Sequence, residues 1–375
     1  MIPFNKPYLT GKETHYLYQA VSSGKISGNG VFTQKCQSYF EKSLGSKKTL
    51  LTTSCTDALE MSAILIDIKD GDEVILPSYT FVSTANAFVL RGAKIIFADC
   101  NVDNPNIDAN TIESLITSKT KAIVPVHYGG MACDMDRIMQ IAEKYNLYVI
   151  EDAAQAIDSY YNGKPLGSIG NLATFSFHET KNIISGEGGM LVVNDGLFSR
   201  RSEIIWEKGT NRAEFFRGEV NKYGWVDIGS SFLMSDILAA FLYAQIEHLE
   251  IIQNKRKNIR KRYIKNLQEL EKMGYIDLPK IPTFATDNGH MMYILCKNLL
   301  ERTSLIEFLK KNEILSVFHY LGLHQSPFYS SKHDGRILAN CNRFEDCLLR
   351  LPLFFELKDQ EIDYICDKIY DFFKK

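Results

Sequence analysis

The chain has 375 residues, of which 45% are hydrophobic and 23% are charged, and its formal net charge is −2. This length suits a large domain with a smaller one, and the composition is that of a globular protein with a sizeable core. A charge this close to zero disfavours a general nucleic-acid binder, which needs a basic excess or stripe. No apolar run approaches the roughly 20 residues of a membrane helix, the N-terminus has no secretory-signal pattern, and the eight cysteines form no C-x-x-C pair. We therefore expect a cytoplasmic protein with reduced thiols, no metal site, and neither membrane nor nucleic acid as partner.

Short apolar segments alternate with helical segments from about residue 50 to residue 195. Strands are predicted at residues 74–76, 94–98, 122–126 and 147–150, and helices at residues 81–90 and 134–145. This order predicts an α/β fold whose sheet is mostly parallel and covered by helices on both faces. Ligands of such sheets bind beyond the carboxyl ends of the strands, so the residues that follow each strand are the candidates for a site.

The C-terminal part begins with a charged helical stretch, KRKNIRKRYIK, at residues 255–265. Its basic residues suit nucleic acid, but a solvated helix face with Ile259, Tyr263 and Ile264 turned inward is the favoured interpretation. We predict that this helix joins a large domain, residues 1–245, to a small α+β domain, residues 246–375.

A first polar segment lies at the start of a predicted helix. Ser54, Cys55 and Thr56 precede a helical run that continues to Leu65. The free N–H groups of a helix N-terminus, together with hydroxyl side chains, form a natural phosphate seat. Simple N-capping by Ser54 or Thr53 is the alternative, and for this segment alone it fits better.

Two carboxylates, Glu151 and Asp152, follow a buried apolar strand. Because side chains alternate along an extended strand, Asp152 and Glu151 face opposite ways, and Asp152 is the one beyond the strand end. A carboxylate there can pair with the ring nitrogen of pyridoxal phosphate and keep it protonated, so that the ring accepts electrons. A capping role for Asp152 in the next turn is the alternative.

A lysine follows a further predicted strand at residues 173–177. The alternating residues Ala173, Phe175 and Phe177 lead to Lys181 and then to a GEGG turn at residues 186–189. A lysine beside a ligand site can form a Schiff base once its pKa is lowered by burial or nearby positive charge, and glycines let the backbone approach a flat ring. A lone loop lysine is usually solvated, but the order of phosphate seat, Asp152 and Lys181 favours a cofactor site.

Longer segments carry a resemblance to a known family. DEVILPSYTFVSTANAFVLRGAKIIFADC, VIEDAAQA and FSFHETKNI followed by GEGG resemble the DegT/DnrJ/EryC1/StrS sugar aminotransferases, and the similarity covers nearly the whole chain. The segments SCT, SFHETKN, EKGTNR, FFRG and GSSFLMSD resemble members of that family that act on dTDP-linked sugars. The resemblance implies an aspartate-aminotransferase-like fold of type I, with a seven-stranded sheet in the large domain, and pyridoxal 5'-phosphate as cofactor.

The resemblance also implies roles for individual residues. Lys181 would form the Schiff base, Asp152 would pair with the pyridine nitrogen, and Gln155 would bond the ring hydroxyl. Phe81 would lie against the ring, with core packing as its alternative. The residues implied at the cofactor phosphate are Ser54, Cys55, Thr56 and Ser176, together with Ser231, which stands where many members have an asparagine that reaches across a homodimer with shared active sites.

The implied reaction is a two-stage transfer of an amino group from L-glutamate to C4 of dTDP-4-dehydro-6-deoxy-D-glucose. The galacto product is favoured over the gluco product, and the product serves surface polysaccharide synthesis, such as O-antigen or enterobacterial common antigen. Weaker substrate candidates are His178, which replaces a tyrosine of many members, Arg212, Arg217, His319, Tyr320 and His324. For Arg212 and Arg217 a surface salt bridge is an equal alternative, and for His319 a structural role is.

Three other functions are disfavoured. Sugar dehydratases of the same fold replace the Schiff-base lysine with histidine, whereas Lys181 is present; His178, three residues before it, keeps this alternative open. A nucleotide-dependent oxidoreductase needs a G-x-G-x-x-G motif directly after a strand, and the sequence has none. A regulator that binds pyridoxal phosphate without catalysis does not need the combination of Lys181, Asp152 and Gln155.

Overall fold

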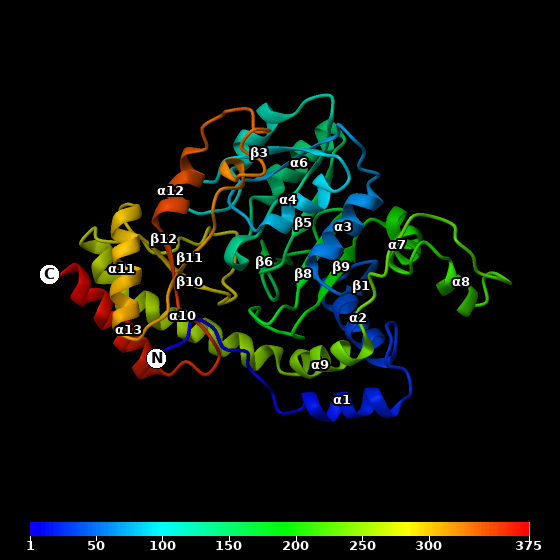
Figure 1. The fold of residues 1–375 in the computed structure, drawn as a ribbon, viewed down its shortest axis with the longest axis horizontal. Coiled ribbons are helices and arrows are strands. Elements are labelled where there is room, and N and C mark those ends of the chain that lie inside the picture. Colours follow the sequence, from blue (N-terminus) through cyan, green and yellow to red (C-terminus); the bar gives the residue numbers. More distant parts are fainter. Residues whose placement is uncertain (375) are drawn as a thin grey trace.

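The computed structural model describes residues 1–374. A seven-stranded sheet forms the larger part, and a three-stranded sheet lies at the other end of the molecule (Figure 1). The helices α9 (Asp236–Glu247) and α10 (Leu249–Lys272) run along one edge from the first part to the second. Of the helices in residues 1–374, none combines the length and the hydrophobicity needed to cross a lipid bilayer.

The large sheet is mostly parallel, as predicted. Its strand order is β1-β9-β8-β5-β4-β2-β3, and β9 alone runs antiparallel to its neighbours among these seven strands. The strands are β1 (Lys48–Thr52), β2 (Glu73–Pro77), β3 (Lys94–Ala98), β4 (Thr120–Ile123), β5 (Tyr148–Asp152), β8 (Leu172–Ser176) and β9 (Gly189–Val193).

One predicted strand is shorter than the pattern indicated. Residues 122–126 were expected to be extended throughout, but β4 ends at Ile123, and Val126 keeps only an isolated bridge to Asp152. The reason is Pro125, which has no N–H to donate to a neighbouring strand.

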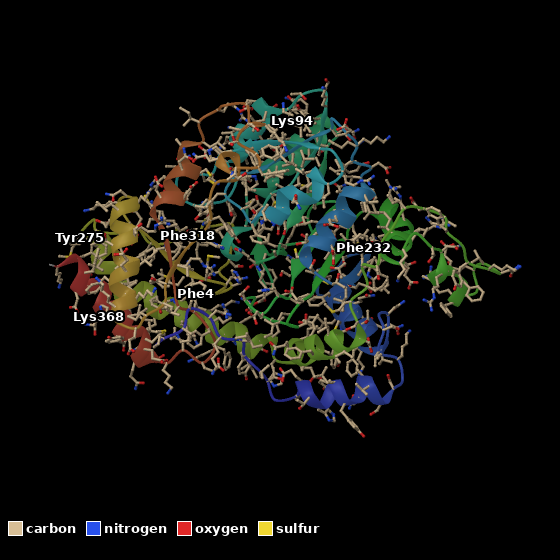
Figure 2. The ribbon with its side chains drawn as sticks, viewed as in Figure 1. Phe4, Lys94, Phe232, Tyr275, Phe318 and Lys368 are labelled. Carbon is tan, nitrogen blue, oxygen red and sulfur yellow. The ribbon has the colours of Figure 1, made fainter. Side chains whose placement is uncertain are left out.

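Alternating strand residues form two apolar layers, one on each face of the sheet. On β9, Leu191 and Val193 join the buried cluster that contains α3 (Cys55–Leu65) and α4 (Val82–Val89), whereas Met190 and Val192 join the cluster on the other face. That second cluster contains α2 (Val31–Leu44), α6 (Met135–Tyr145) and α9. Side chains of both layers fill the space between the sheet and the helices that cover it (Figure 2).

The predicted helices begin and end where the local signals indicate. The Asp134 carboxylate caps α6 by accepting the Arg137 N–H at 3.2 Å, and Asn146 ends that helix in the left-handed region at φ 53°. The remaining elements of the large part are α1 (Glu13–Ser22), α5 (Ala109–Ile112), β6 (Tyr160–Tyr161), β7 (Lys164–Pro165), α7 (Ser199–Trp206) and α8 (Arg212–Phe216).

The three-stranded sheet is antiparallel, in the order β10-β12-β11. Its elements are β10 (Met292–Leu295), α11 (Leu299–Lys311), β11 (Val317–Phe318), α12 (Ala339–Cys347), β12 (Leu348–Leu351) and α13 (Asp359–Phe373). Helix α10 turns Ile259 and Tyr263 into the core of this part, as predicted, while Ile264 is half-buried. The predicted division between residues 245 and 246 falls in the last turn of α9 and stays a prediction.

Candidate active site

A cavity of about 600 Å³ lies at the carboxyl ends of the parallel strands and is closed on one side by residues of the three-stranded sheet. This is the position expected for a ligand site in a sheet of this type. The predicted site residues that line it are Ser54, Cys55, Thr56, Phe81, Asp152, Gln155, Ser176, His178, Lys181, His319 and Tyr320.

Asp152, at the end of β5, is buried in the wall of this cavity. Its Oδ2 accepts a hydrogen bond from the Thr84 hydroxyl at 2.7 Å, and its Oδ1 accepts the Ala154 N–H at 3.1 Å. Burial raises the pKa of Asp152, and these two hydrogen bonds offset only part of that effect. The carboxylate therefore lacks a full positive partner, which a cationic ligand group in the cavity can supply.

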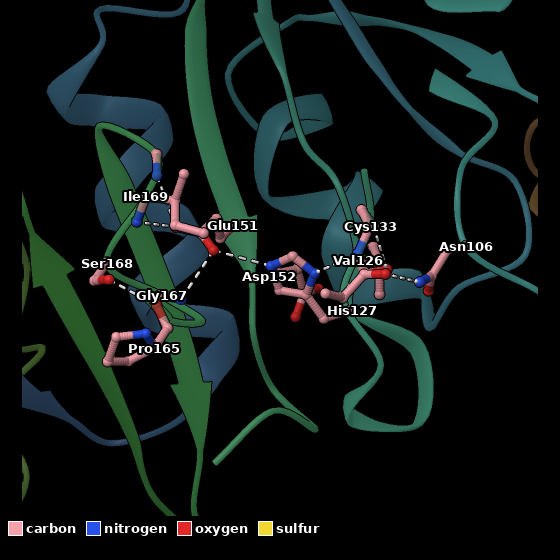
Figure 3. Close-up of polar contacts among 12 residues, drawn as sticks. Asn106, Val126, His127, Cys133, Glu151, Asp152, Pro165, Gly167, Ser168 and Ile169 are labelled. Atoms are coloured by element: carbon pink, nitrogen blue, oxygen red, sulfur yellow. Dashed lines mark hydrogen bonds and ion pairs between the residues drawn. The ribbon is translucent and has the colours of Figure 1, made fainter. Parts of the chain in front are cut away.

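Glu151 faces the opposite way, as the strand alternation predicts. Its carboxylate is fully buried and accepts four hydrogen bonds, from His127 Nε2 at 2.9 Å and from the backbone N–H groups of Gly167, Ile169 and Gly170 at 2.7–2.8 Å (Figure 3). Burial raises the pKa of Glu151, but the bonds from His127 and the loop outweigh it, so that the pKa lies below its usual range. Glu151 thus braces the strand that carries Asp152.

His127 extends this network to the neighbouring strand end. Its Nδ1 accepts the Cys133 N–H at 3.2 Å, so its Nε2 carries the proton donated to Glu151. The His127 backbone N–H donates to the Asp152 carbonyl at 3.1 Å. The pair His127–Glu151 therefore fixes the backbone directly behind the Asp152 side chain (Figure 3).

Lys181 lies in the loop between β8 and β9 and reaches into the cavity. The loop is pinned by backbone hydrogen bonds from Phe177 N–H to the Gly188 carbonyl at 2.8 Å and from Glu179 N–H to the Gly186 carbonyl at 2.9 Å. Burial lowers the pKa of the Lys181 ammonium, and Cys55 and Asp152 oppose that shift only in part. Among the lysines in the printed sequence, this one is therefore poised to present a neutral amine to a ligand.

The N-terminus of α3 forms another wall. The Ser54 hydroxyl accepts the Asp57 N–H at 3.1 Å, so the capping interpretation is confirmed, while the phosphate seat stays a prediction. Thr56 Oγ1 donates to Ser83 Oγ at 2.8 Å, which places two more hydroxyl groups at the cavity. Gly189 makes this arrangement possible, because a Cβ there would lie only 2.3 Å from the Cys55 nitrogen.

Gln155, His319 and Tyr320 add further polar groups to the cavity wall. Gln155 accepts the Gly129 N–H at 2.6 Å and donates to the Tyr320 hydroxyl at 3.2 Å. His319 Nδ1 lies 2.9 Å from the Tyr128 hydroxyl, and burial lowers the pKa of this histidine, so it is neutral.

Phe81 and His178 lie nearer the mouth of the cavity. Phe81 is 57% exposed, so its alternative assignment to core packing is wrong. Its ring centroid lies 6.2 Å from that of Tyr320. His178 is half-buried, and its Nδ1 lies 2.9 Å from the Thr180 hydroxyl.

Four predicted residues lie outside the cavity. Arg217 pairs with Glu219 at 2.7 Å and with Glu203 at 3.0 Å, which is the surface-salt-bridge alternative. Arg212 lies over the ring of Phe216. Ser231 is exposed, and its predicted contact across a dimer stays a prediction. His324 is buried, and its Nδ1 lies 2.7 Å from the Ser78 hydroxyl.

Two basic residues of the cavity wall were not predicted. Arg350, on β12, and His290, just before β10, both line the cavity. The His290 ring forms a hydrogen bond of 2.8 Å with the side chain of Asn182, which is the residue directly after Lys181. Arg350 had a signal in the sequence, because a single arginine interrupts the apolar run LLRLPLF at residues 348–354.

Comparisons with known proteins agree with this geometry. Residues 7–370 match the model of the DegT/DnrJ/EryC1/StrS aminotransferase family. The chain belongs to that family. It is 33% identical over 373 residues to the GDP-perosamine synthase of Escherichia coli O157:H7, covering 99% of this chain and 98% of that protein. It is also 31% identical over 386 residues to the spore coat polysaccharide biosynthesis protein SpsC of Bacillus subtilis strain 168, covering 100% and 97%.

A solved structure shares the fold. The putative sugar aminotransferase Spr1654 from Streptococcus pneumoniae, in its PMP form, superposes with a TM-score of 0.91 at 27% identity, covering 100% of this chain and 99% of the other. The same protein has been solved in a PLP form, at 26% identity. These findings confirm the predicted fold class, the prediction of a nucleotide-sugar aminotransferase and the prediction of pyridoxal phosphate as cofactor.

Proposed function

We propose that this aminotransferase moves an amino group from L-glutamate to C4 of dTDP-4-dehydro-6-deoxy-D-glucose. The product would be dTDP-4-amino-4,6-dideoxygalactose, used for a surface polysaccharide such as O-antigen or enterobacterial common antigen. The observation that carries the proposal is that Lys181 and Asp152 line one buried cavity in a chain of this family. The choice of sugar rests on the resemblance of segments such as SFHETKN and EKGTNR to dTDP-sugar enzymes.

The residues of the cavity fit pyridoxal phosphate. The buried Asp152 carboxylate, whose pKa is raised by burial, suits a protonated pyridine nitrogen, and Lys181, whose pKa is lowered by burial, suits a covalent bond to the cofactor aldehyde. Gln155 would bond the ring hydroxyl and Phe81 would cover the ring. The phosphate would be bound by Ser54, Cys55, Thr56 and Ser176. When bound, the cofactor supplies an electron sink for the carbanion at the reacting carbon.

The chain's own contribution to the reaction is proton transfer and orientation. With the amino donor bound to the cofactor in its place, Lys181 Nζ would be a free amine in a buried site and would take the Cα proton of glutamate. The same Nζ would pass that proton to the cofactor carbon, and in the second stage it would take a proton from that carbon and deliver it to C4 of the sugar. Asp152 would hold the ring nitrogen in both stages, and the His127–Glu151 pair fixes the backbone that carries Asp152.

Replacing Lys181 tests the cofactor assignment. We expect Lys181→Ala to lose the absorbance of covalently held cofactor and all turnover, because no other amine takes its position. Lys164→Ala is the matched control, since Lys164 is exposed on β7. A Lys181→Ala protein with full transamination would overturn the assignment.

The product can be identified directly by NMR after incubation of the enzyme with glutamate and dTDP-4-dehydro-6-deoxy-D-glucose. Axial nitrogen at C4 is the galacto product that we propose, and equatorial nitrogen is the gluco alternative. Release of ammonia without an amino sugar would favour a dehydratase. A GDP-linked 4-keto sugar belongs in the same assay, because one relative is named GDP-perosamine synthase. The cytoplasmic location stays a prediction.

We further propose a homodimer with shared active sites. The segment around α8 projects from the large sheet (Figure 1) and exposes Phe216, Tyr223 and Trp225 by 70%, 51% and 85%. A cluster of exposed aromatic residues of this kind suits a protein interface. Sedimentation of Trp225→Glu should give monomers, whereas Leu300→Glu, an equally exposed apolar position on α11, should sediment as the wild type does. A dimeric Trp225→Glu protein would contradict this interface.

A further inference from the structure

Arg350 enters the cavity because of its place in the small sheet. It lies on the central strand β12, where it pairs with Tyr293 on one side and Val317 on the other. Its neighbours Leu349 and Leu351 point into the core of the three-stranded sheet, so Arg350 points to the opposite face, toward Lys181 and the large sheet. Phe4 covers the guanidinium, with 4.8 Å between the guanidinium carbon and the ring centroid, and lies beside the small sheet in Figure 2.

The charge of Arg350 has no anionic partner within residues 1–374. No carboxylate of the described chain is among the groups that act on its charge, and its buried Nε has no hydrogen-bond partner. Burial lowers the pKa of Arg350, while the groups that favour its charge are the hydroxyls of Tyr128, Tyr320 and Tyr79. An arginine buried without an anion is costly in a structural position and is typical of a binding site.

Another buried arginine shows the difference. Arg256, on α10, donates from Nε to the Gly289 carbonyl at 3.0 Å and from Nη2 to the His290 carbonyl at 2.8 Å. Arg260, one turn later, forms a salt bridge with Asp287. Both are satisfied within the chain and neither lines the cavity, whereas Arg350 lines the cavity and is not satisfied.

We propose that Arg350 binds the α-carboxylate of the amino donor. This inference rests on the proposed function, which requires an amino acid whose nitrogen reaches the place of Lys181 Nζ. In an amino acid the nitrogen and the carboxylate are bonded to the same carbon, so the carboxylate must bind close to Lys181. Arg350 is the cation that acts electrostatically on Lys181 from the small-sheet side, while Asp152 and Cys55 act on it from the large sheet. Its planar guanidinium can hold a carboxylate through two parallel hydrogen bonds.

A phosphate is also an oxyanion that an arginine can bind. The predicted phosphate seat lies elsewhere in the cavity, however, which favours the carboxylate as the ligand of Arg350. That seat lies at the N-terminus of α3, where Ser54 and Thr56 sit with Cys55. Arg350 lies instead on β12 of the three-stranded sheet, where it pairs with Tyr293. Two oxyanions, one at each wall, match a cofactor phosphate and a donor carboxylate bound at the same time.

The test separates the two half-reactions. We expect Arg350→Gln to lower the second-order rate constant for the reaction of the pyridoxal-phosphate-loaded protein with L-glutamate by at least ~50-fold. The reason is the loss of two charge-assisted hydrogen bonds. Reaction of the pyridoxamine-phosphate-loaded protein with the keto-sugar should change by less than about 3-fold, because no donor carboxylate is present. Arg350→Lys should recover only part of the glutamate rate, because it keeps the charge and loses the fork. Equal losses in both half-reactions would overturn the proposal.

Ligand binding supplies a readout that does not depend on turnover. Glutarate carries the carboxylates of the donor without its amine, and calorimetric titration of the cofactor-loaded wild type should show binding that Arg350→Gln weakens. Arg302→Gln is the control, since Arg302 is buried on α11 and does not line the cavity. If Arg350→Gln instead weakens binding of pyridoxal phosphate or inorganic phosphate and leaves glutarate unchanged, Arg350 binds a phosphate and the proposal is wrong. If the wild type transfers no amino group to any keto-sugar, the proposed function fails, while the glutarate titration still decides the role of Arg350.

Discussion

Replacing Glu151 with glutamine tests the network behind the site, because it keeps the shape of the side chain and removes its charge. Glu151 Oε1 accepts the N–H groups of Ile169 and Gly170, and Oε2 accepts the Gly167 N–H and His127 Nε2. A glutamine amide has one accepting oxygen, so its NH₂ group faces two donors in either orientation. A change of tautomer does not rescue the site, since a proton on His127 Nδ1 would oppose the Cys133 N–H.

The expected loss follows from these contacts. Two hydrogen bonds to a charged acceptor are removed, each worth about 1.5–3 kcal/mol, so the free energy of unfolding should fall by about 3–6 kcal/mol. Urea unfolding at pH 7, followed by circular dichroism and by fluorescence, measures this change if the two probes coincide. Glu143→Gln, the same chemical change on the exposed side of α6, should cost less than about 0.5 kcal/mol.

The pH dependence of the free energy of unfolding tests the same prediction independently. The folded state lowers the pKa of Glu151 below its ordinary value of 4.5. Its charge therefore stabilises the fold fully above pH about 4.5, and this contribution is lost as the pH falls through the folded pKa. The difference in stability between the wild type and Glu151→Gln should thus shrink in acid. A difference that stays constant below pH 4.5, or a variant as stable as Glu143→Gln, would refute the reasoning.

Three further predictions concern the cavity itself. Asp152→Asn removes the partner of the ring nitrogen and should slow the half-reaction with L-glutamate by at least ~100-fold, measured by stopped-flow absorbance, while Lys181 still binds the cofactor. Ser54→Ala and Ser235→Ala each remove a helix cap and should each cost about 1 kcal/mol in thermal unfolding, but only Ser54→Ala should weaken pyridoxal phosphate binding in a titration. Because burial lowers the pKa of Lys181, the rate at which cofactor-free protein forms its bond with pyridoxal phosphate should rise with pH around a midpoint below 10.5, and a midpoint at 10.5 would contradict that effect.

Much of this site could be predicted because it lies on regular elements. Alternation along β5 separated Asp152 from Glu151, and the structure places one in the cavity and the other in a buried network. The order of strands and helices placed the ends of the parallel strands at one edge. The mostly parallel sheet then brought Ser54, Asp152 and Lys181 together, although long stretches of chain separate them.

The partners of these residues could not be predicted, because they depend on contacts between distant segments. Glu151 is recognised by His127 and by a loop after β7, and no local pattern pairs those segments. Arg350 reaches the cavity only because β12 is the central strand of a sheet that packs against the other one. The lone arginine in LLRLPLF signalled a buried charge, but the sequence did not indicate which cavity it would enter.

The charges of the cavity account for the order in which ligands would fill it. Burial raises the pKa of Asp152 and lowers the pKa values of Lys181 and Arg350, so the charged form of each group is disfavoured until a partner binds. The protonated pyridine nitrogen of the cofactor would pair with Asp152 and its aldehyde would bond the Lys181 amine, which would leave Arg350 as the unpaired charge. An amino acid then brings the missing anion together with the amine that displaces Lys181. The low-dielectric site would therefore favour binding of the cofactor first and of the donor second. The cofactor would neutralise the charge of Asp152, and the donor carboxylate would then neutralise the charge of Arg350.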